Sequence, residues 1–188
     1  MVYQLKISLK YSEPEIWRRV LIPADMTLLD LHDVIQISMG WEDCHLFQFM
    51  KDDKLYAIRE DSDFTWDEKK YIECTDIIVT KLLTEEGDKI EYEYDFGDSW
   101  IHTITLEKIF DDKDIDGPLP HCIEGERECP PEDCGGIPGY NYMLAVLKDP
   151  NHDDYNDIRE YFGFGPDEEI DLNYVDFEEI NMTFETVF

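Results

Sequence analysis

Basic residues are scarce in this sequence. Lys and Arg together number 16 against 46 Asp and Glu, which gives a formal net charge of −30. Proteins that bind nucleic acids or anionic membranes directly use clustered Lys and Arg. The densest basic groups here, Arg18–Arg19 and Lys69–Lys70, both have acidic residues close by in the sequence. Direct binding of nucleic acid or membrane is therefore not expected, and the partner is expected to be a protein or a small ligand.

Long apolar runs are also absent. No stretch approaches the roughly 20 residues that cross a bilayer, and the first 15 residues lack the apolar core of a signal peptide. The five cysteines are an odd number without an export signal, which favours reduced thiols or metal ligation over a disulfide framework. Together these features predict a cytoplasmic protein.

Familiar catalytic signatures are missing too. The sequence has no P-loop, no dinucleotide-binding glycine motif, no serine nucleophile elbow and no HExxH pattern. These absences disfavour a nucleotide-driven enzyme. They leave the question of whether the protein is an enzyme open, with a preference for a role without catalysis.

The apolar content is sufficient for a folded core despite the charge. Hydrophobic residues make up 43% of the chain and aromatic residues 13%. A length of 188 residues fits one domain of ordinary size. We therefore expect a single folded domain over residues 1–188.

Hydrophobic periodicity in the N-terminal half predicts a strand hairpin, a helix and two more strands. The expected ranges are Val2–Lys10, Ile16–Ile22, Thr27–Met39, Leu46–Met50 and Lys54–Ile58. Thr27 is suited to cap the helix at its start, and Gly40 follows its end. The acidic stretch Arg59–Lys70 is expected to be a surface loop, and Ile77–Leu83 is ambiguous between strand and short helix.

A second hairpin is predicted from Lys89–Phe96 and Trp100–Ile109, joined by Gly97-Asp98-Ser99. With a three-residue loop, Phe96 lies opposite Trp100 and Tyr94 opposite His102. This register gathers the aromatic side chains on one face and places Asp95 on the other.

The segment 111–138 has no periodic pattern and contains five prolines and four glycines, so a long loop is expected there. Helices are expected afterwards, over Gly139–Lys148, beyond Asn151 and near Leu172–Ile180. The predicted fold class is α+β, an antiparallel sheet of hairpins with one early helix and a helical C-terminal third.

The long loop holds candidate metal ligands. Thiolates and imidazole are natural zinc ligands, and zinc is the one cofactor that the sequence suggests. The candidate set is His121, Cys122, Cys129 and Cys134. The alternative is that these cysteines are small buried residues packed beneath the loop. Glu132 and Asp133 are either hard ligands or, as we prefer, capping acids for the following helix.

The second hairpin carries further candidates. Asp95, Asp98 and His102 are suited to hold a metal or to perform acid–base chemistry. Turn formation by Asp98 and a packed core position for His102 explain them equally well, and the predicted register separates Asp95 from His102. Cys44 and His45 could also be ligands, but neighbouring side chains in a strand point to opposite faces.

Several motifs in order resemble the plasmid pRiA4b ORF-like family. They are Glu15-Ile16-Trp17-Arg18-Arg19, Leu31–Gln36 with Gly40-Trp41 and His45, Tyr94–Trp100, and Glu128–Gly136 with Tyr140. The resemblance extends from the first strand to the helix expected after Asp171. It implies a compact α+β domain of microbial proteins, some of them encoded on plasmids and transposable elements, with no established activity.

Three functions are compatible with these observations. The first is a non-catalytic binding or adaptor module that uses the 111–138 loop for recognition, because binding residues concentrate in loops. The second is a metal-dependent hydrolase built from the hairpin turn and the loop. The third is an accessory protein of a plasmid or transposable element that acts through a protein partner. The candidate binding residues are Asp95, Asp98, Trp100, His102, Glu132, Asp133 and Tyr140.

Overall fold

The computed structural model describes residues 1–58, 70–165 and 168–188. The acidic loop expected at 59–70 therefore lies, except for Lys70, outside the described residues. Within them, eight strands form one sheet in the order β5-β4-β3-β6-β7-β1-β2-β8. All neighbouring strands are antiparallel except β4 and β5. The strands are β1 (Val2–Leu9), β2 (Ile16–Pro23), β3 (Phe47–Lys51), β4 (Lys54–Ala57), β5 (Tyr71–Glu73), β6 (Lys89–Tyr94), β7 (Trp100–Phe110) and β8 (His121–Glu126).

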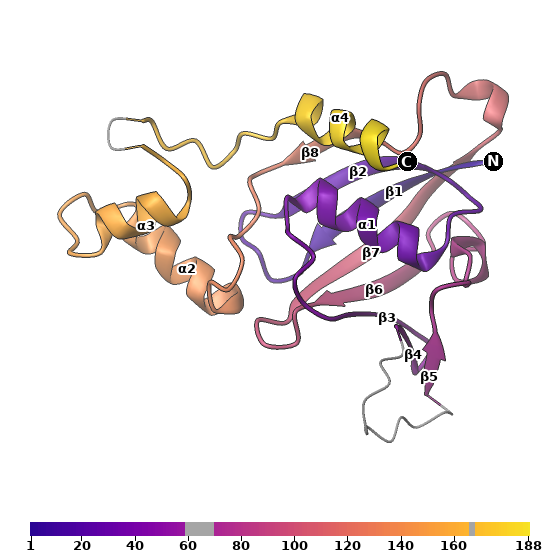
Figure 1. Cartoon of the computed structure of the whole chain (residues 1–188), viewed down its shortest axis with the longest axis horizontal. Coiled ribbons are helices and arrows are strands. Elements are labelled where there is room, and N and C mark those ends of the chain that lie inside the picture. The colour runs from indigo at the N-terminus through magenta and orange to yellow at the C-terminus, as the bar shows by residue number, and fades with distance from the viewer. Residues whose placement is uncertain (59–69, 166–167) are drawn as a thin grey trace.

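Two helices lie in front of one face of the sheet, and two others form a separate pair beyond its end (Figure 1). The covering helices are α1 (Leu28–Met39) and α4 (Phe177–Val187), and the pair consists of α2 (Gly136–Val146) and α3 (Tyr155–Tyr161). Short 3₁₀ turns occur at Val79–Lys81 and Asp112–Asp114. None of the helices in the described ranges combines the length and hydrophobicity needed to cross a bilayer.

Helix α1 begins and ends as its sequence predicts. The Thr27 hydroxyl accepts a hydrogen bond from the Asp30 backbone amide, and the Asp30 carboxylate accepts one from the Thr27 amide in return. Gly40 ends the helix with a positive φ of 81°, a conformation that glycine adopts without strain. Leu28, Leu31 and Val34 are fully buried, which fixes the helix on the sheet.

The core lies between the sheet and these helices and is rich in aromatic side chains. Tyr92, Tyr94 and Trp100 from the β6–β7 hairpin have no exposed surface. Trp41, which follows α1, packs against them with ring centroids 5.1 Å from Tyr94 and 6.0 Å from Trp100. Offset and tilted contacts of this kind stabilise aromatic clusters. The aromatic side chains of the β6–β7 hairpin therefore anchor it in the core, and the turn of the hairpin lies outside this aromatic cluster.

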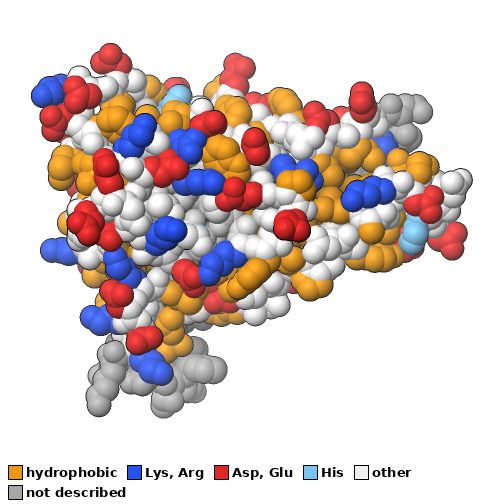
Figure 2. Space-filling model, turned by 180° about the vertical axis from the view of Figure 1, so that it is seen from behind, with side chains coloured by type: hydrophobic (Ala, Val, Ile, Leu, Met, Phe, Trp, Pro, Cys, Tyr) orange, Lys and Arg blue, Asp and Glu red, His pale blue; other side chains and the backbone are white. Residues whose placement is uncertain are grey.

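Basic and acidic side chains are interspersed on the molecular face seen from behind (Figure 2). Lys6 pairs with Glu15 at 3.0 Å, Arg19 pairs with Glu107 at 2.6 Å, and Lys10 pairs with Glu91. Lys and Arg do not gather into one patch on this face.

The β6–β7 hairpin has the predicted buried face but a different register. Tyr94 lies opposite Trp100 and Tyr92 opposite His102, so each pair is displaced by two residues from the expected one. The turn is longer than expected because residues 95–99 are all outside the ladder. The Ser99 amide donates to the Asp95 carbonyl at 2.6 Å, which closes this wide turn.

The segment 111–138 is not the continuous loop that its composition indicates. Residues His121–Glu126 form β8, an edge strand that pairs with β2. The Asn181 side chain of α4 accepts a hydrogen bond from the Cys122 amide at 2.7 Å and donates one to its carbonyl at 3.0 Å. Order in this segment therefore comes from the sheet and from α4.

The C-terminal third is only partly helical. Helix α2 begins three residues before its expected start, and α3 lies within the range expected beyond Asn151. The last helix was expected near Leu172–Ile180, but α4 begins at Phe177. Its N-cap is Asp176, whose carboxylate accepts from the Glu179 amide at 2.9 Å. The capping residue and not the apolar spacing decides where this helix starts.

Candidate functional site

His45 lies at the centre of a polar cluster between the sheet and the segment after β8. Its Nε2 is 3.2 Å from Asp133 Oδ1, 3.8 Å from Asp95 Oδ2 and 3.9 Å from Glu132 Oε2. The ligand atoms of His45, Asp95 and Asp133 all lie within 4.8 Å of one another, and so do those of Cys44, His45 and Glu132. One imidazole thus faces three carboxylates.

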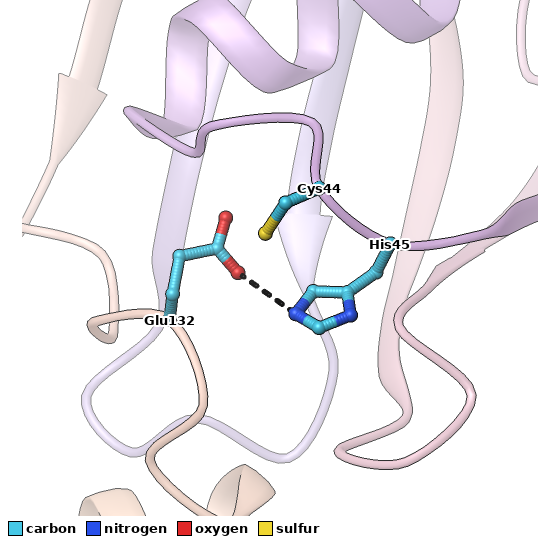
Figure 3. Close-up of side chains that lie close together, drawn as sticks. All are labelled: Cys44, His45 and Glu132. Atoms are coloured by element: carbon cyan, nitrogen blue, oxygen red, sulfur yellow. Dashed lines mark ion pairs between the residues drawn. The ribbon is translucent and has the colours of Figure 1, made fainter.

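Cys44, His45 and Glu132 point toward a common space (Figure 3). Cys44 and His45 belong to an irregular segment between α1 and β3, and β3 begins only at Phe47. The alternation of side chains in a strand, which would separate the two residues, therefore does not apply here. This is why sequence reasoning left His45 outside the site. The Cys44-His45 pair beside the motif Gly40-Trp41 was the only signal that could have found it.

Asp95 reaches the cluster because of the wide turn of the β6–β7 hairpin. It adopts a positive φ of 53°, and its Oδ1 accepts a hydrogen bond from the Gly97 amide at 2.8 Å. Its own amide donates to the Leu46 carbonyl at 3.0 Å, which ties the turn to the His45 segment. Its side chain is only 10% exposed. These contacts leave Oδ2 directed at His45.

Glu132 is held by hydrogen bonds to its other oxygen. Glu132 Oε1 accepts from the Tyr94 hydroxyl at 3.1 Å and from the Glu42 amide at 2.9 Å. Burial, followed by the contact with the Cys44 side chain and then the nearby Glu132 carboxylate, raises the pKa of Tyr94 well above its usual value of 10, so the phenol keeps its proton. Glu132 Oε2 then faces His45. The capping role preferred for this residue is not what these contacts show.

The hairpin turn and the start of α2 are in direct contact. Asp98 Oδ2 accepts a hydrogen bond from the Gly135 amide at 3.0 Å. A Cβ atom on Gly136 would lie 2.5 Å from the Asp98 carbonyl oxygen, and Gly136 has a φ of 65°. Only glycine fits this approach. The Gly135-Gly136 pair therefore allows the turn that carries Asp95 to meet the segment that carries Glu132 and Asp133.

The other predicted binding residues are part of the core. Trp100 and His102 have no exposed surface, and Tyr140 of α2 is 2% exposed beside Phe162. His102 Nδ1 is 3.0 Å from the Trp100 carbonyl oxygen, and burial lowers the pKa of His102 to about 3. As the register indicated, Asp95 and His102 are not partners. These three residues support the site by packing.

The four residues of the predicted zinc set are not brought together. Cys122 Sγ donates to the Glu124 carbonyl, Cys129 Sγ lies 3.0 Å from Met39 Sδ, and Cys134 stands at the start of α2. His121 and Cys122 are adjacent on β8, so their side chains point to opposite faces. Burial raises the pKa of Cys122 and Cys129 to about 11 and that of Cys134 to about 12. None of the metal-ligand groups in the described residues includes any of these four.

A cleft of about 580 Å³ adjoins the cluster, and Glu132 is shared by both. One wall is the segment 128–132 with the end of α1, and the other is α4 with the residues before it. Ile37, Met39, Trp41, Pro130, Pro131 and Ile180 supply apolar lining, and Glu128, Glu132, Asp176 and Glu179 supply carboxylates. Among the described residues, Arg18 is the one basic residue that lines it, and its guanidinium donates to the carbonyls of Ser38, Trp17 and Glu126.

Comparison with known proteins gives relatives without an assigned activity. The sequence profile of the family described as "Plasmid pRiA4b ORF-3-like protein" matches residues 1–179. The uncharacterized protein y4hQ of Sinorhizobium fredii is 34% identical over 163 residues, which cover 86% of this chain and 81% of the relative. The crystal structure of MM3350, a protein of unknown function from Methanosarcina mazei Go1, superposes with a TM-score of 0.79 at 33% identity, over 95% of this chain and 96% of that one. The fold and the sequence agree on one conclusion: this chain belongs to the plasmid pRiA4b ORF-3-like protein family.

Proposed function

We propose that this protein is a non-catalytic binding module that recognises a positively charged segment of a partner protein. The recognition surface is the cleft between residues 128–132 and α4, so only this part of the 111–138 segment takes part. The observation that carries the proposal is the lining of the cleft, which combines an apolar floor with four carboxylates. A segment with Lys or Arg next to apolar side chains matches both features.

The charge of the cleft is compensated only in part from within, because Arg18 is set against four carboxylates among the described residues that line it. The Arg18 side chain is buried, its Nε and Nη1 groups donate to backbone carbonyls, and its Nη2 group donates to Cys129 Sγ. Burial raises the pKa of Glu128, and the positive charge of Arg18 opposes this shift only in part. A bound ammonium or guanidinium group would supply the missing opposite charge. The net charge of −30 also attracts a basic partner over distances comparable to the Debye length.

The test is peptide binding measured by fluorescence polarisation at about 0.15 M salt. Labelled peptides of alternating Lys and Leu are compared with matched Glu and Leu peptides. Glu179→Lys, which reverses a charge that lines the cleft, should weaken binding of the basic peptide by about tenfold. Glu185→Lys makes the same change on an exposed part of α4 outside the cleft and should alter affinity less than about twofold.

Two outcomes would contradict this function. Equal binding of the acidic and basic peptides would remove the charge argument. An equal effect of Glu179→Lys and Glu185→Lys would mean that overall charge and not the cleft attracts the peptide.

A second candidate, metal-dependent hydrolysis, is favoured by the meeting of the hairpin turn and the segment 132–133 at His45. His102 has no part in it, because it lies in the core. Its test is release of product from peptide and ester substrates by protein supplied with Zn²⁺, with His45→Ala as the comparison. Hydrolysis that is equal in the variant, or absent with the wild type, would reject this candidate.

A further inference from the structure

The polar cluster leaves two shielded atoms without hydrogen bonds. Within the described residues, His45 Nε2 and Glu132 Oε2 are both inaccessible to solvent and neither has a hydrogen-bond partner. Leaving a buried polar atom unpaired is unfavourable, and it is more so for a charged group. The two atoms face each other at 3.9 Å, and Asp95 Oδ2 and Asp133 Oδ1 lie 3.8 Å and 3.2 Å from His45 Nε2. Such a group is stable when a cation lies between its members.

We propose that His45, Asp95 and Asp133 bind a divalent transition-metal ion, for which Zn²⁺ is the reference. Glu132 Oε2 is 3.9 Å from His45 Nε2 but does not form one group with the two aspartates, so it becomes a fourth ligand only when its side chain shifts toward them. Metal–ligand bonds of about 2.0–2.1 Å place the donors of a tetrahedral site about 3.3 Å apart. The distances of 3.2, 3.8 and 3.9 Å around His45 Nε2 lie close to this spacing. One imidazole with several carboxylates suits Zn²⁺ and its first-row neighbours better than Mg²⁺ or Ca²⁺.

The protein orients two of these carboxylates in the way that metal ligands are oriented. Asp95 uses Oδ1 to accept from the Gly97 amide, and Glu132 uses Oε1 to accept from Tyr94 and Glu42. In each case the second oxygen is the one that faces His45. Hydrogen bonds to the non-ligating atom fix the direction of a ligand and are a regular feature of metal sites.

Asp133 supplies the route of entry. Its side chain is 71% exposed, whereas those of Asp95 and Glu132 are 10% and 18% exposed. An ion that arrives from solvent therefore meets one exposed carboxylate first and then the less exposed side chains of the cluster. This asymmetry also provides an experiment, because Asp133 can be changed without disturbing the core.

Cys44 is the competing ligand. Its Sγ lies within 4.8 Å of ligand atoms of His45 and Glu132, but the residue is exposed and the sulfur is 3.8 Å from the Tyr94 hydroxyl. We assign the site to the carboxylates because three of them converge on one nitrogen. A protonated His45 that merely pairs with these carboxylates is the other alternative. Such an ion pair would bind no metal.

The experiment is calorimetric titration of chelator-treated protein with Zn²⁺ at about 0.15 M salt and in excess Mg²⁺, conditions that suppress binding to the acidic surface. The proposal expects one saturable equivalent. Asp133→Asn and His45→Ala should each weaken it by at least about tenfold. His152→Ala is the matched control, since His152 is also 3.8 Å from a carboxylate, that of Asp154, but lies outside the cluster. It should change the affinity less than about twofold.

Co²⁺ provides a spectroscopic readout of the ligand set. Bound Co²⁺ should give visible d–d absorption without the near-ultraviolet charge-transfer band of a thiolate ligand, and Cys44→Ser should leave both the spectrum and the Zn²⁺ affinity unchanged. Loss of binding in Cys44→Ser would overturn the assignment. Absence of a saturable equivalent, or full affinity in Asp133→Asn, would overturn the site itself. Neither result bears on peptide binding in the cleft, so this inference and the binding function can fail separately.

Discussion

His32 and His45 are both next to carboxylates, but their hydrogen bonding differs. His32 lies in α1 and is almost completely buried. Its Nδ1 is 2.8 Å from the Tyr92 hydroxyl, and its Nε2 is 2.8 Å from Asp43 Oδ1. It also stacks on Phe47 with ring centroids 3.6 Å apart. His45 is partly exposed, with one ring nitrogen that faces three carboxylates and makes no hydrogen bond within the described residues.

The difference teaches which feature separates a structural histidine from a candidate ligand. His32, Asp33 and Asp43 also lie close enough together to be considered as metal ligands. However, each nitrogen of His32 already has one well-placed partner, and burial lowers the pKa of this imidazole, so it is held neutral in a closed network. At His45 the acceptors outnumber the protons that can satisfy them. Unused acceptors, and not proximity alone, point to a cation.

Replacing His32 should have the largest effect on folding. His32→Ala removes a buried ring and leaves Tyr92 and Asp43 each without one partner, so we expect the free energy of unfolding to fall by about 3–5 kcal/mol. His45→Ala should lower it by about 1 kcal/mol or less, because its side chain is 28% exposed. Urea denaturation followed by circular dichroism measures both. Similar losses of unfolding free energy in the two variants would contradict the distinction between His32 as a structural histidine and His45 as a candidate ligand.

Zinc should stabilise the wild type through His45 but not through His32. At a free concentration one hundred times its dissociation constant, a ligand specific for the folded state adds about 2.7 kcal/mol to stability. This gain should fall to about 1.4 kcal/mol or less in His45→Ala, because its affinity is expected to be at least about tenfold weaker. It should persist in His32→Asn, a variant chosen to keep a polar group at the buried position. A gain of equal size in His45→Ala would place the ion elsewhere.

The buried imidazole of His102 should make stability sensitive to acid. Burial lowers the pKa of His102 from 6.5 to about 3 in the folded state. Between these values the unfolded chain holds a proton that the folded chain does not, so the free energy of unfolding falls as pH falls below about 6.5. The loss from pH 6.5 to 5 should be about 2 kcal/mol greater in the wild type than in His102→Gln. If the free energy of unfolding depends on pH in the same way in the wild type and in His102→Gln, groups other than His102 cause the acid sensitivity.

The five cysteines should differ in their reactivity toward a thiol reagent. Modification of the reactive one should hardly change the free energy of unfolding. Cys44 is exposed, whereas Cys74, Cys122, Cys129 and Cys134 are buried, and burial raises the pKa of each of these four thiols. A thiol reagent should therefore modify one cysteine quickly and the others only after unfolding. Saturating Zn²⁺ should not protect Cys44. Protection would return Cys44 to the ligand set.

Much of the fold could be predicted because its signals are local. The cap at Thr27, the stop at Gly40 and the alternation in β1 each depend on residues within a few positions. The β6–β7 hairpin shows the limit of such reasoning. Alternation correctly identified its buried face, but the register depends on a hydrogen bond inside the turn, between Ser99 and Asp95.

The candidate site was only half predictable. Asp95, Glu132 and Asp133 were chosen for their chemistry, but their convergence depends on the close approach of Gly136 to Asp98, which lies far from it in sequence. His45 is missed because the sequence places it at the start of a strand, where neighbouring side chains point to opposite faces, whereas β3 begins only at Phe47. The strand β8 was missed because its six residues have no alternating pattern, and its order depends on β2 and α4.

The contact between Asn181 and β8 also bears on how the molecule avoids self-association. A strand at the edge of a sheet presents unpaired amides and carbonyls that can recruit another chain. The Asn181 carboxamide takes both backbone groups of Cys122, as the peptide group of a ninth strand would. Asn181 belongs to α4, so the group that pairs with the middle of β8 is a side chain. It cannot continue along the edge as another strand would. The helix therefore blocks aggregation through this edge as well as covering the core.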